Sequence, residues 1–199
     1  MRRRIPITMM KGYRPFTDKN AGLYPYSSLQ VNVPVLIAQQ IIKWGNVEIP
    51  EKNIYAPPND LTHGREKEIH VTVLYGIHAP NPNGLRSLIE LQEPFEIKLG
   101  RVSIFATNDD FDVVKVEAYS PGLFHLNQLL KNNISHTSCY NTFKPHVTIA
   151  YVKKNSCDNL IGNNCFRNWR WIANTAIFSS TNGDKTAIRF NTSLPALCS

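Results

Sequence analysis

Two short segments of this sequence share a set of residues that could carry out acid–base chemistry. The first is His70-Val71-Thr72, and the second, 76 residues later, is His146-Val147-Thr148. Two imidazoles can divide the roles of general base and general acid near neutral pH, because an unperturbed histidine has a pKa of about 6.5. Threonine hydroxyls can donate hydrogen bonds to phosphoryl oxygens, whose negative charge grows in the transition state. The pair therefore predicts cleavage or transfer at a phosphodiester by a scheme that requires no metal.

Both segments have the alternating, β-branched composition of a strand. Alternate side chains of a strand point to opposite faces, so His70, Thr72 and Leu74 are expected on one face and Tyr75 on the other. The second copy repeats this pattern. If the two strands lie side by side about a pseudo-two-fold axis, the histidines and threonines converge on one pocket.

These paired His-x-Thr-aliphatic motifs resemble those of the 2H phosphoesterase superfamily, over about residues 25–192. The resemblance implies an α+β fold in which two pseudo-symmetric βαβ-type lobes with antiparallel sheets surround a central cleft. It also implies metal-independent phosphodiester cleavage, without a cofactor. The catalytic residues that it implies are His70, Thr72, His146 and Thr148.

Within the superfamily, the residues after the first motif and the segment 99–105 look most like the phage anti-CBASS nucleases. Those enzymes degrade the cyclic di- and trinucleotide messengers of bacterial antiphage signalling. A 2′,3′-cyclic phosphodiesterase or a 2′,5′-oligoadenylate phosphodiesterase, acting on RNA ends or oligonucleotides, is an alternative. A non-catalytic module that sequesters a nucleotide is another.

Charge is concentrated near the beginning of the sequence, where residues 1–20 carry a net +5 of the total +7. We expect a basic, flexible arm there and a single two-lobed domain over 21–199, with the motif lobes at about 60–110 and 111–192. A long polyanion requires a spread phosphate-binding surface, so the near-neutral remainder favours a cyclic or short oligonucleotide over duplex DNA. No apolar run is long enough to span a membrane. We expect a monomer in the cytoplasm, which for a viral protein is the host cytoplasm.

A nucleobase needs a surface on which to stack, and exposed aromatic side chains can supply it. Tyr24 and Trp171 are the predicted base-binding residues, and Lys144 is placed ahead of the second motif to contact phosphate. Other aromatic candidates are Tyr26, Phe143 and Trp169. The six histidines and four cysteines fit no compact zinc pattern, so no metal site is predicted.

The rest of the chain predicts elements that would position the motifs. Helices are expected over 34–45, ended by Gly45, over 83–92, capped by Asn83, and over 121–132. Strands are expected over 28–33, 95–106, 113–119, 171–180 and 186–191. This order of elements indicates two αβ repeats.

Overall fold

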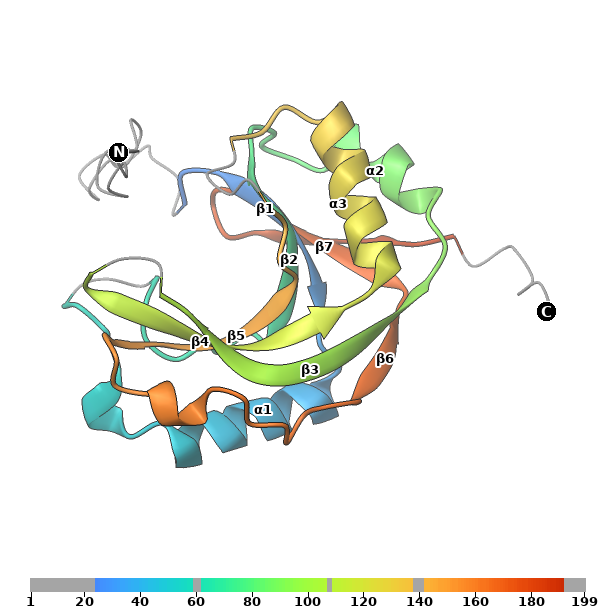
Figure 1. Cartoon of the computed structure of the whole chain (residues 1–199). Helices are drawn as coiled ribbons and strands as arrows, with labels where there is room; N and C mark the ends of the chain where they lie inside the picture. The colour runs from blue at the N-terminus through green and yellow to red at the C-terminus, as the bar shows by residue number, and fades with distance from the viewer. Residues whose placement is uncertain (1–23, 59–61, 107–108, 138–141, 192–199) are drawn as a thin grey trace, which may run out of the picture.

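An eight-stranded sheet organises the residues that a computed structural model describes, which are 24–58, 62–106, 109–137 and 142–191 (Figure 1). The predicted arm at 1–20, with Cys139 and Cys198, lies outside the described residues. The strands are β1 (Ser27–Asn32), β2 (His70–Ile77), β3 (Phe95–Phe105), β4 (Phe111–Tyr119), β5 (His146–Lys153), β6 (Arg170–Ala173), β7 (Thr175–Ser179) and β8 (Lys185–Arg189). The helices are α1 (Val35–Glu48), α2 (Asn83–Glu90) and α3 (Pro121–Asn133), with short 3₁₀ turns η2 (Glu51–Asn53) and η3 (Asp158–Leu160).

The strand order is β6-β3-β4-β5-β2-β1-β7-β8, and neighbouring strands run antiparallel. The sheet therefore has two halves of four strands, which meet where β2 pairs with β5. In one half α1 connects β1 to β2, and in the other α3 connects β4 to β5. Each half contains strands from distant parts of the chain. The two halves therefore do not correspond to lobes divided near residue 110.

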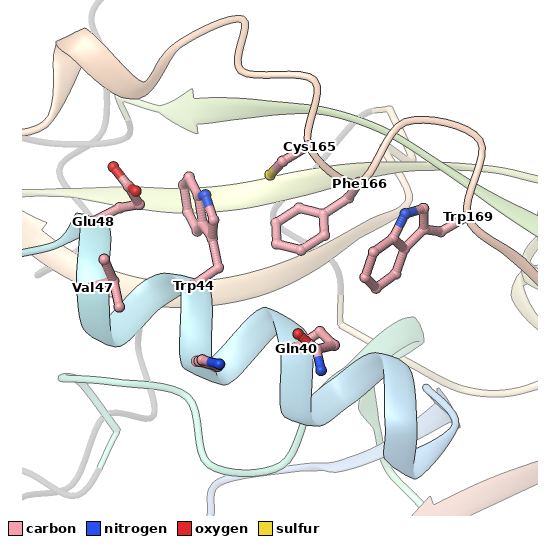
Figure 2. A pocket seen from close by; sticks show the side chains of 8 residues that line it. Gln40, Trp44, Val47, Glu48, Cys165, Phe166 and Trp169 are labelled. Carbon is pink, nitrogen blue, oxygen red and sulfur yellow. The ribbon is translucent and has the colours of Figure 1, made fainter.

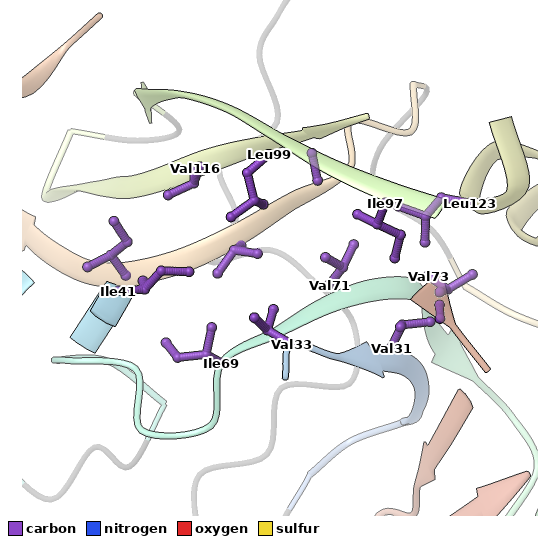
Figure 3. Packing of buried hydrophobic residues seen from close by; sticks show 14 of the residues in the cluster. Val31, Val33, Ile41, Ile69, Val71, Val73, Ile97, Leu99, Val116 and Leu123 are labelled. Atoms are coloured by element: carbon purple, nitrogen blue, oxygen red, sulfur yellow. The ribbon is translucent and has the colours of Figure 1, made fainter. Parts of the chain in front are cut away.

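The helices hold the two halves together. α1 follows β1 but packs against β5, and α3 follows β4 but packs against β2, while α2 lies beside α3 and β8 (Figure 1). Ile41 of α1 and Val71 of β2 are both fully buried in the same core cluster (Figure 3). Each half thus contributes a helix that covers the motif strand of the other half. No helix in the described part of the chain is long and apolar enough to cross a membrane.

Two of the differences between the predicted and the observed helix ends have a local reason. α1 continues past Gly45 to Glu48, and a methyl group on Gly45 would lie 2.6 Å from Cγ2 of Ile149. This glycine therefore permits the close approach of α1 to β5. Asn83 is the first residue of α2 rather than its cap, and its backbone N–H donates to the side-chain oxygen of Asn81 at 3.1 Å.

The strand predicted over 171–180 is in fact two strands, β6 and β7, separated at Asn174. β6 pairs with β3 and β7 pairs with β1, so the chain passes here from one half of the sheet to the other. The carbonyl oxygen of Asn174 accepts a hydrogen bond of 2.9 Å from the N–H of Phe190. No glycine or proline marks this break in the sequence.

Candidate active site

The two motifs lie on β2 and β5, which pair at one position, Val71 opposite Val147. Both valines are fully buried, so their side chains point into the core. The residues immediately before and after them consequently point to the other face of the sheet. That face carries the polar residues of both motifs.

The register brings the four predicted catalytic side chains together. With the two valines paired, His70 lies opposite Thr148 and Thr72 lies opposite His146. All four side chains are partly exposed. Directly opposed residues have Cβ atoms about 4.5–5.5 Å apart. Each histidine therefore stands beside the threonine of the other motif.

The backbone fixes the same tautomer in both histidines. Nδ1 of His146 lies 2.7 Å from the carbonyl oxygen of Lys144, and Nδ1 of His70 is bonded to the carbonyl oxygen of Glu68. A carbonyl oxygen can only accept, so Nδ1 carries the hydrogen in each neutral ring. Nε2 is then the unprotonated nitrogen, available to take up a proton in both rings.

Burial makes both imidazoles harder to protonate than a free histidine. It lowers the pKa of His146 to about 4, opposed by the hydrogen bond to the Lys144 carbonyl and assisted by the positive charges of Lys115 and His70. Burial also lowers the pKa of His70, but there the carboxylate of Glu66 opposes the effect. A cation thus acts on one ring and an anion on the other, which distinguishes the two histidines electrostatically.

β2 has a β-bulge directly after Thr72. Consecutive residues of β1 pair with Thr72 and Leu74, so Val73 is the extra residue. Its carbonyl oxygen accepts a hydrogen bond of 2.6 Å from the buried amide of Asn127. The extra residue reverses the alternation that follows. Leu74 is therefore buried, and Tyr75 is exposed on the motif face, which is the opposite of the predicted arrangement.

β5 has the same irregularity after Thr148. Consecutive residues of β4 pair with Thr148 and Ala150, which leaves Ile149 as the extra residue. The carbonyl oxygen of Ile149 accepts the backbone N–H of Glu66 at 2.9 Å. Tyr151 consequently turns to the motif face, as its counterpart on β2 does. Both motif strands therefore present a tyrosine five residues beyond the histidine.

Further aromatic rings accompany each tyrosine. The ring centroid of Tyr151 lies 4.8 Å from that of His63 and 5.6 Å from that of Phe111. The ring of Tyr75 lies 6.1 Å from that of Tyr26, in an edge-on contact. We refer to these two groups as the Tyr151 cluster and the Tyr75 cluster. They lie beyond the threonines on the two motif strands.

The predicted substrate-binding residues lie in different places. Lys144 is exposed, and its positive charge adds to the effect of burial, which is the main cause that lowers the pKa of Lys115. Trp171 is 9 % exposed and belongs to the core on β6, so the prediction for this residue is wrong. Tyr24 is exposed, and its N–H donates to the carbonyl oxygen of Thr181 at 2.9 Å, beside the turn between β7 and β8.

Besides the two tyrosine clusters, Lys115, Glu66 and Asn127 lie near the motifs and were not predicted as part of the site. Lys115 on β4 is 6 % exposed and pairs with Thr148. Glu66 and Asn127 hold the bulges, as described above. The signal for Lys115 was present in the sequence, because a charged residue stands there with valines directly before and after it. Glu66 and Asn127 gave no such signal, since their contacts join distant parts of the chain.

Two cavities are lined by neither the motif histidines nor the motif threonines. One of about 290 Å³ separates α1 from residues 165–169 and is lined by Trp44, Phe166 and Trp169 (Figure 2). The other, of about 560 Å³, is lined in part by Arg101 and Glu117. Since Glu117 pairs with His146 across the strands, the larger cavity borders the motif residues. Within the described residues, no group of three or more histidine, cysteine, aspartate or glutamate side chains could hold a metal ion.

Comparison with known proteins identifies the family. Residues 56–163 match the 2′-5′ RNA ligase superfamily, which is more than half of the chain. The chain belongs to this family of 2H phosphoesterases and is a phosphodiesterase, an enzyme of the hydrolase class. A search of curated proteins found no match by sequence.

Solved structures confirm the predicted α+β fold of the 2H phosphoesterases. LigT of E. coli in its apo form is 18% identical, with a TM-score of 0.60 over 84% of this chain and 98% of that chain. TT0787 of Thermus thermophilus is 15% identical, with a TM-score of 0.55 over 82% of this chain and 95% of that chain. Usb1 of Kluyveromyces marxianus, solved with uridine monophosphate, is 12% identical, with a TM-score of 0.51 over 82% and 97% of the two chains.

Proposed function

We propose that this enzyme cleaves the 3′,5′ linkages of cyclic di- and trinucleotide messengers without a metal, and so counters bacterial antiphage signalling. It would act as a monomer in the cytoplasm of the host cell. The observation that carries the proposal is the register of β2 and β5, which sets each motif histidine beside the threonine of the other motif. The near-neutral charge of the chain beyond residue 20 supports a small nucleotide rather than duplex DNA.

In this proposal His146 is the general base. Its low pKa leaves it neutral at pH 7, so Nε2 can take the proton from the 2′-hydroxyl of the substrate. The hydroxyl oxygen then attacks phosphorus and displaces the 5′-oxygen. His70 gives that leaving oxygen a proton from Nε2. Burial lowers the pKa of this ring, and the carboxylate of Glu66 opposes that effect, so it favours the protonated form that the acid needs. The products are a 2′,3′-cyclic phosphate and a free 5′-hydroxyl.

The two threonines and Lys144 would bind the phosphate during this reaction. The hydroxyls of Thr72 and Thr148 donate hydrogen bonds to the non-bridging oxygens, which gain negative charge in the transition state. Lys144 is exposed beside the second motif and offers a further positive charge to the substrate. All of these groups lie on or next to the two motif strands.

The aromatic clusters support a substrate with a nucleoside on each side of the reacting phosphate. Tyr75 and Tyr151 occupy equivalent positions on the two motif strands, so one base can stack at each. A cyclic oligonucleotide meets this requirement at every linkage. A terminal 2′,3′-cyclic phosphate has only one nucleoside at its phosphorus. The pair of clusters therefore favours an internal linkage.

A phosphodiesterase that acts on RNA ends or on 2′,5′-oligoadenylate is the second candidate. The similar LigT of E. coli has been solved with 3′-AMP and the similar Usb1 with uridine monophosphate. These complexes hold single nucleotides and favour an enzyme that acts at the end of an RNA chain.

A substrate panel separates the candidates. We would incubate the enzyme in EDTA with a cyclic dinucleotide, a cyclic trinucleotide, 2′,5′-oligoadenylate and an RNA ending in a 2′,3′-cyclic phosphate, and identify products by chromatography. The proposal expects the cyclic nucleotides to be cleaved with the highest kcat/KM. Preferred cleavage of the RNA end or of the 2′,5′ linkage would contradict it and support the second candidate.

Variants of the two tyrosines test the aromatic clusters in the same assay. Stacking is worth about 1–3 kcal/mol per base, so Tyr75→Leu and Tyr151→Leu should each lower kcat/KM by about 5- to 150-fold. Tyr24→Leu tests the earlier prediction for that residue. Normal cleavage by both Tyr75→Leu and Tyr151→Leu would show that bases do not bind at the clusters.

A further inference from the structure

Lys115 is a buried lysine on the motif face of β4. Its side chain is 6 % exposed, and its cross-strand partner on β5 is Thr148. Nζ donates a hydrogen bond of 2.6 Å to Oγ of Ser103 and lies 4.1 Å from the centroid of the Phe105 ring. Among the described residues, no carboxylate forms an ion pair with this ammonium group.

Another buried charge on β4, that of Asp112, has an oppositely charged partner. The carboxylate of Asp112, also on β4, is 2 % exposed and lies 2.8 Å from Nζ of Lys154. That buried charge is therefore paired with an opposite one. Burying an ammonium group without an anion is unfavourable, and a hydroxyl and a ring face offset only part of the cost. The surroundings of Lys115 therefore lack an anion, and a bound anionic ligand would supply it.

The nearest carboxylate on the same strand already has partners. Glu117 accepts a hydrogen bond of 2.6 Å from the hydroxyl of Tyr119, and its carboxylate lies 3.4 Å from Nε of Arg101. Lys144, which faces Lys115 from the segment before β5, is another cation. Burial lowers the pKa of Lys115 and the charge of Glu117 opposes this effect, but among the described residues no carboxylate contacts Nζ. The ammonium group can therefore bind an anionic ligand on the motif face.

We propose that Lys115 is a further catalytic residue, which binds a non-bridging oxygen of the reacting phosphate beside Thr148. This inference rests on the proposed reaction at His70 and His146. Phe105 makes an edge-on contact with His146, at 4.8 Å between ring centroids, so the lysine and the base both lie against one ring. From there the ammonium group stabilises negative charge that develops on the phosphate.

Lys115 also affects the protonation of the base. Its positive charge opposes protonation of His146, as does that of His70. The base therefore stays neutral at a lower pH than it would without the lysine. Removal of Lys115 should consequently move the acid limb of the pH–rate profile to higher pH.

The test compares Lys115→Met with Lys43→Met, which removes an exposed lysine of α1. Inorganic phosphate should raise the Tm of the wild type and of Lys43→Met, but not that of Lys115→Met. The turnover of Lys115→Met should fall by about 10²- to 10³-fold, as for loss of one group that stabilises an oxyanion. Its Tm without phosphate should stay the same or rise, because methionine removes a buried charge that lacks an anion.

Two results would overturn the proposal. One is a Lys115→Met variant that cleaves substrate and binds phosphate like the wild type. The other is a variant with a lower Tm in the absence of phosphate and an unchanged acid limb, which would assign the lysine a structural role. If the wild type cleaves no substrate but its binding of phosphate still depends on Lys115, the proposed function fails and the phosphate-binding role stands.

Discussion

Protonation of His146 should couple the stability of the fold to pH. Its pKa is about 4 in the folded protein and about 6.5 in an unfolded chain. The unfolded state therefore binds the proton more tightly, and stability falls as the pH decreases from 6.5 towards 4. At 1.36 kcal/mol per pKa unit, the loss is at most about 3 kcal/mol, and partial exposure of the ring to solvent reduces it. The lowered pKa of His70 acts in the same direction.

Urea unfolding from pH 4 to pH 8 measures this effect. His146→Gln removes the titrating group, so its free energy of unfolding should change less than that of the wild type as the pH falls. His125→Gln is the matched control, because His125 is an exposed histidine on α3. The control should follow the wild type. If His146→Gln showed the same pH dependence as the wild type, the ring would not be buried in its neutral form and the reasoning would be refuted.

Three further predictions concern the supports of the site and its chemistry. Asn127→Leu leaves the carbonyl oxygen of Val73 without its donor, so urea unfolding should show a loss of about 1–3 kcal/mol; an unchanged midpoint would mean that the bulge does not need this bond. Gly45→Ala places a methyl group against Ile149 and should cost about 1–3 kcal/mol in the same assay, unless α1 can move away from β5 at little cost. Turnover should survive EDTA and give a bell-shaped pH–rate profile, whereas loss in EDTA with rescue by zinc or manganese, or a flat profile from about pH 5 to 9, would count against two imidazoles acting alone.

The parts of the structure that follow from local sequence were predictable. The His-x-Thr repeats identified two equivalent strands, and the spacing of apolar residues located α1 and α3 to within a few residues. Alternation along β3 and β4 and the turn between β7 and β8 were equally local signals. The repeat suggested that the strands of His70 and His146 are neighbours, and the pairing of β2 with β5 shows that they are.

The parts that depend on distant contacts were not predictable. Asn127 binds the bulge after Thr72, and Glu66 binds the bulge after Thr148. Both residues lie outside the motifs, so the motif sequences alone do not predict that the following tyrosine changes face. Trp171 is an aromatic residue of a type that can stack on a base, but the pairing of β6 with β3 places it in the core. In each case strand pairing, rather than residue type, decided which face a side chain occupies.

The measurement that tests the central claim most directly is kcat/KM for the wild type, His70→Gln, His146→Gln and the double variant on the preferred substrate. A base and an acid that act in one step form a unit, so each single variant should lose nearly as much activity as the double variant. Thermal unfolding of all four proteins shows whether the fold is retained. If either single variant, still folded, kept activity close to that of the wild type, the two-histidine mechanism would be wrong.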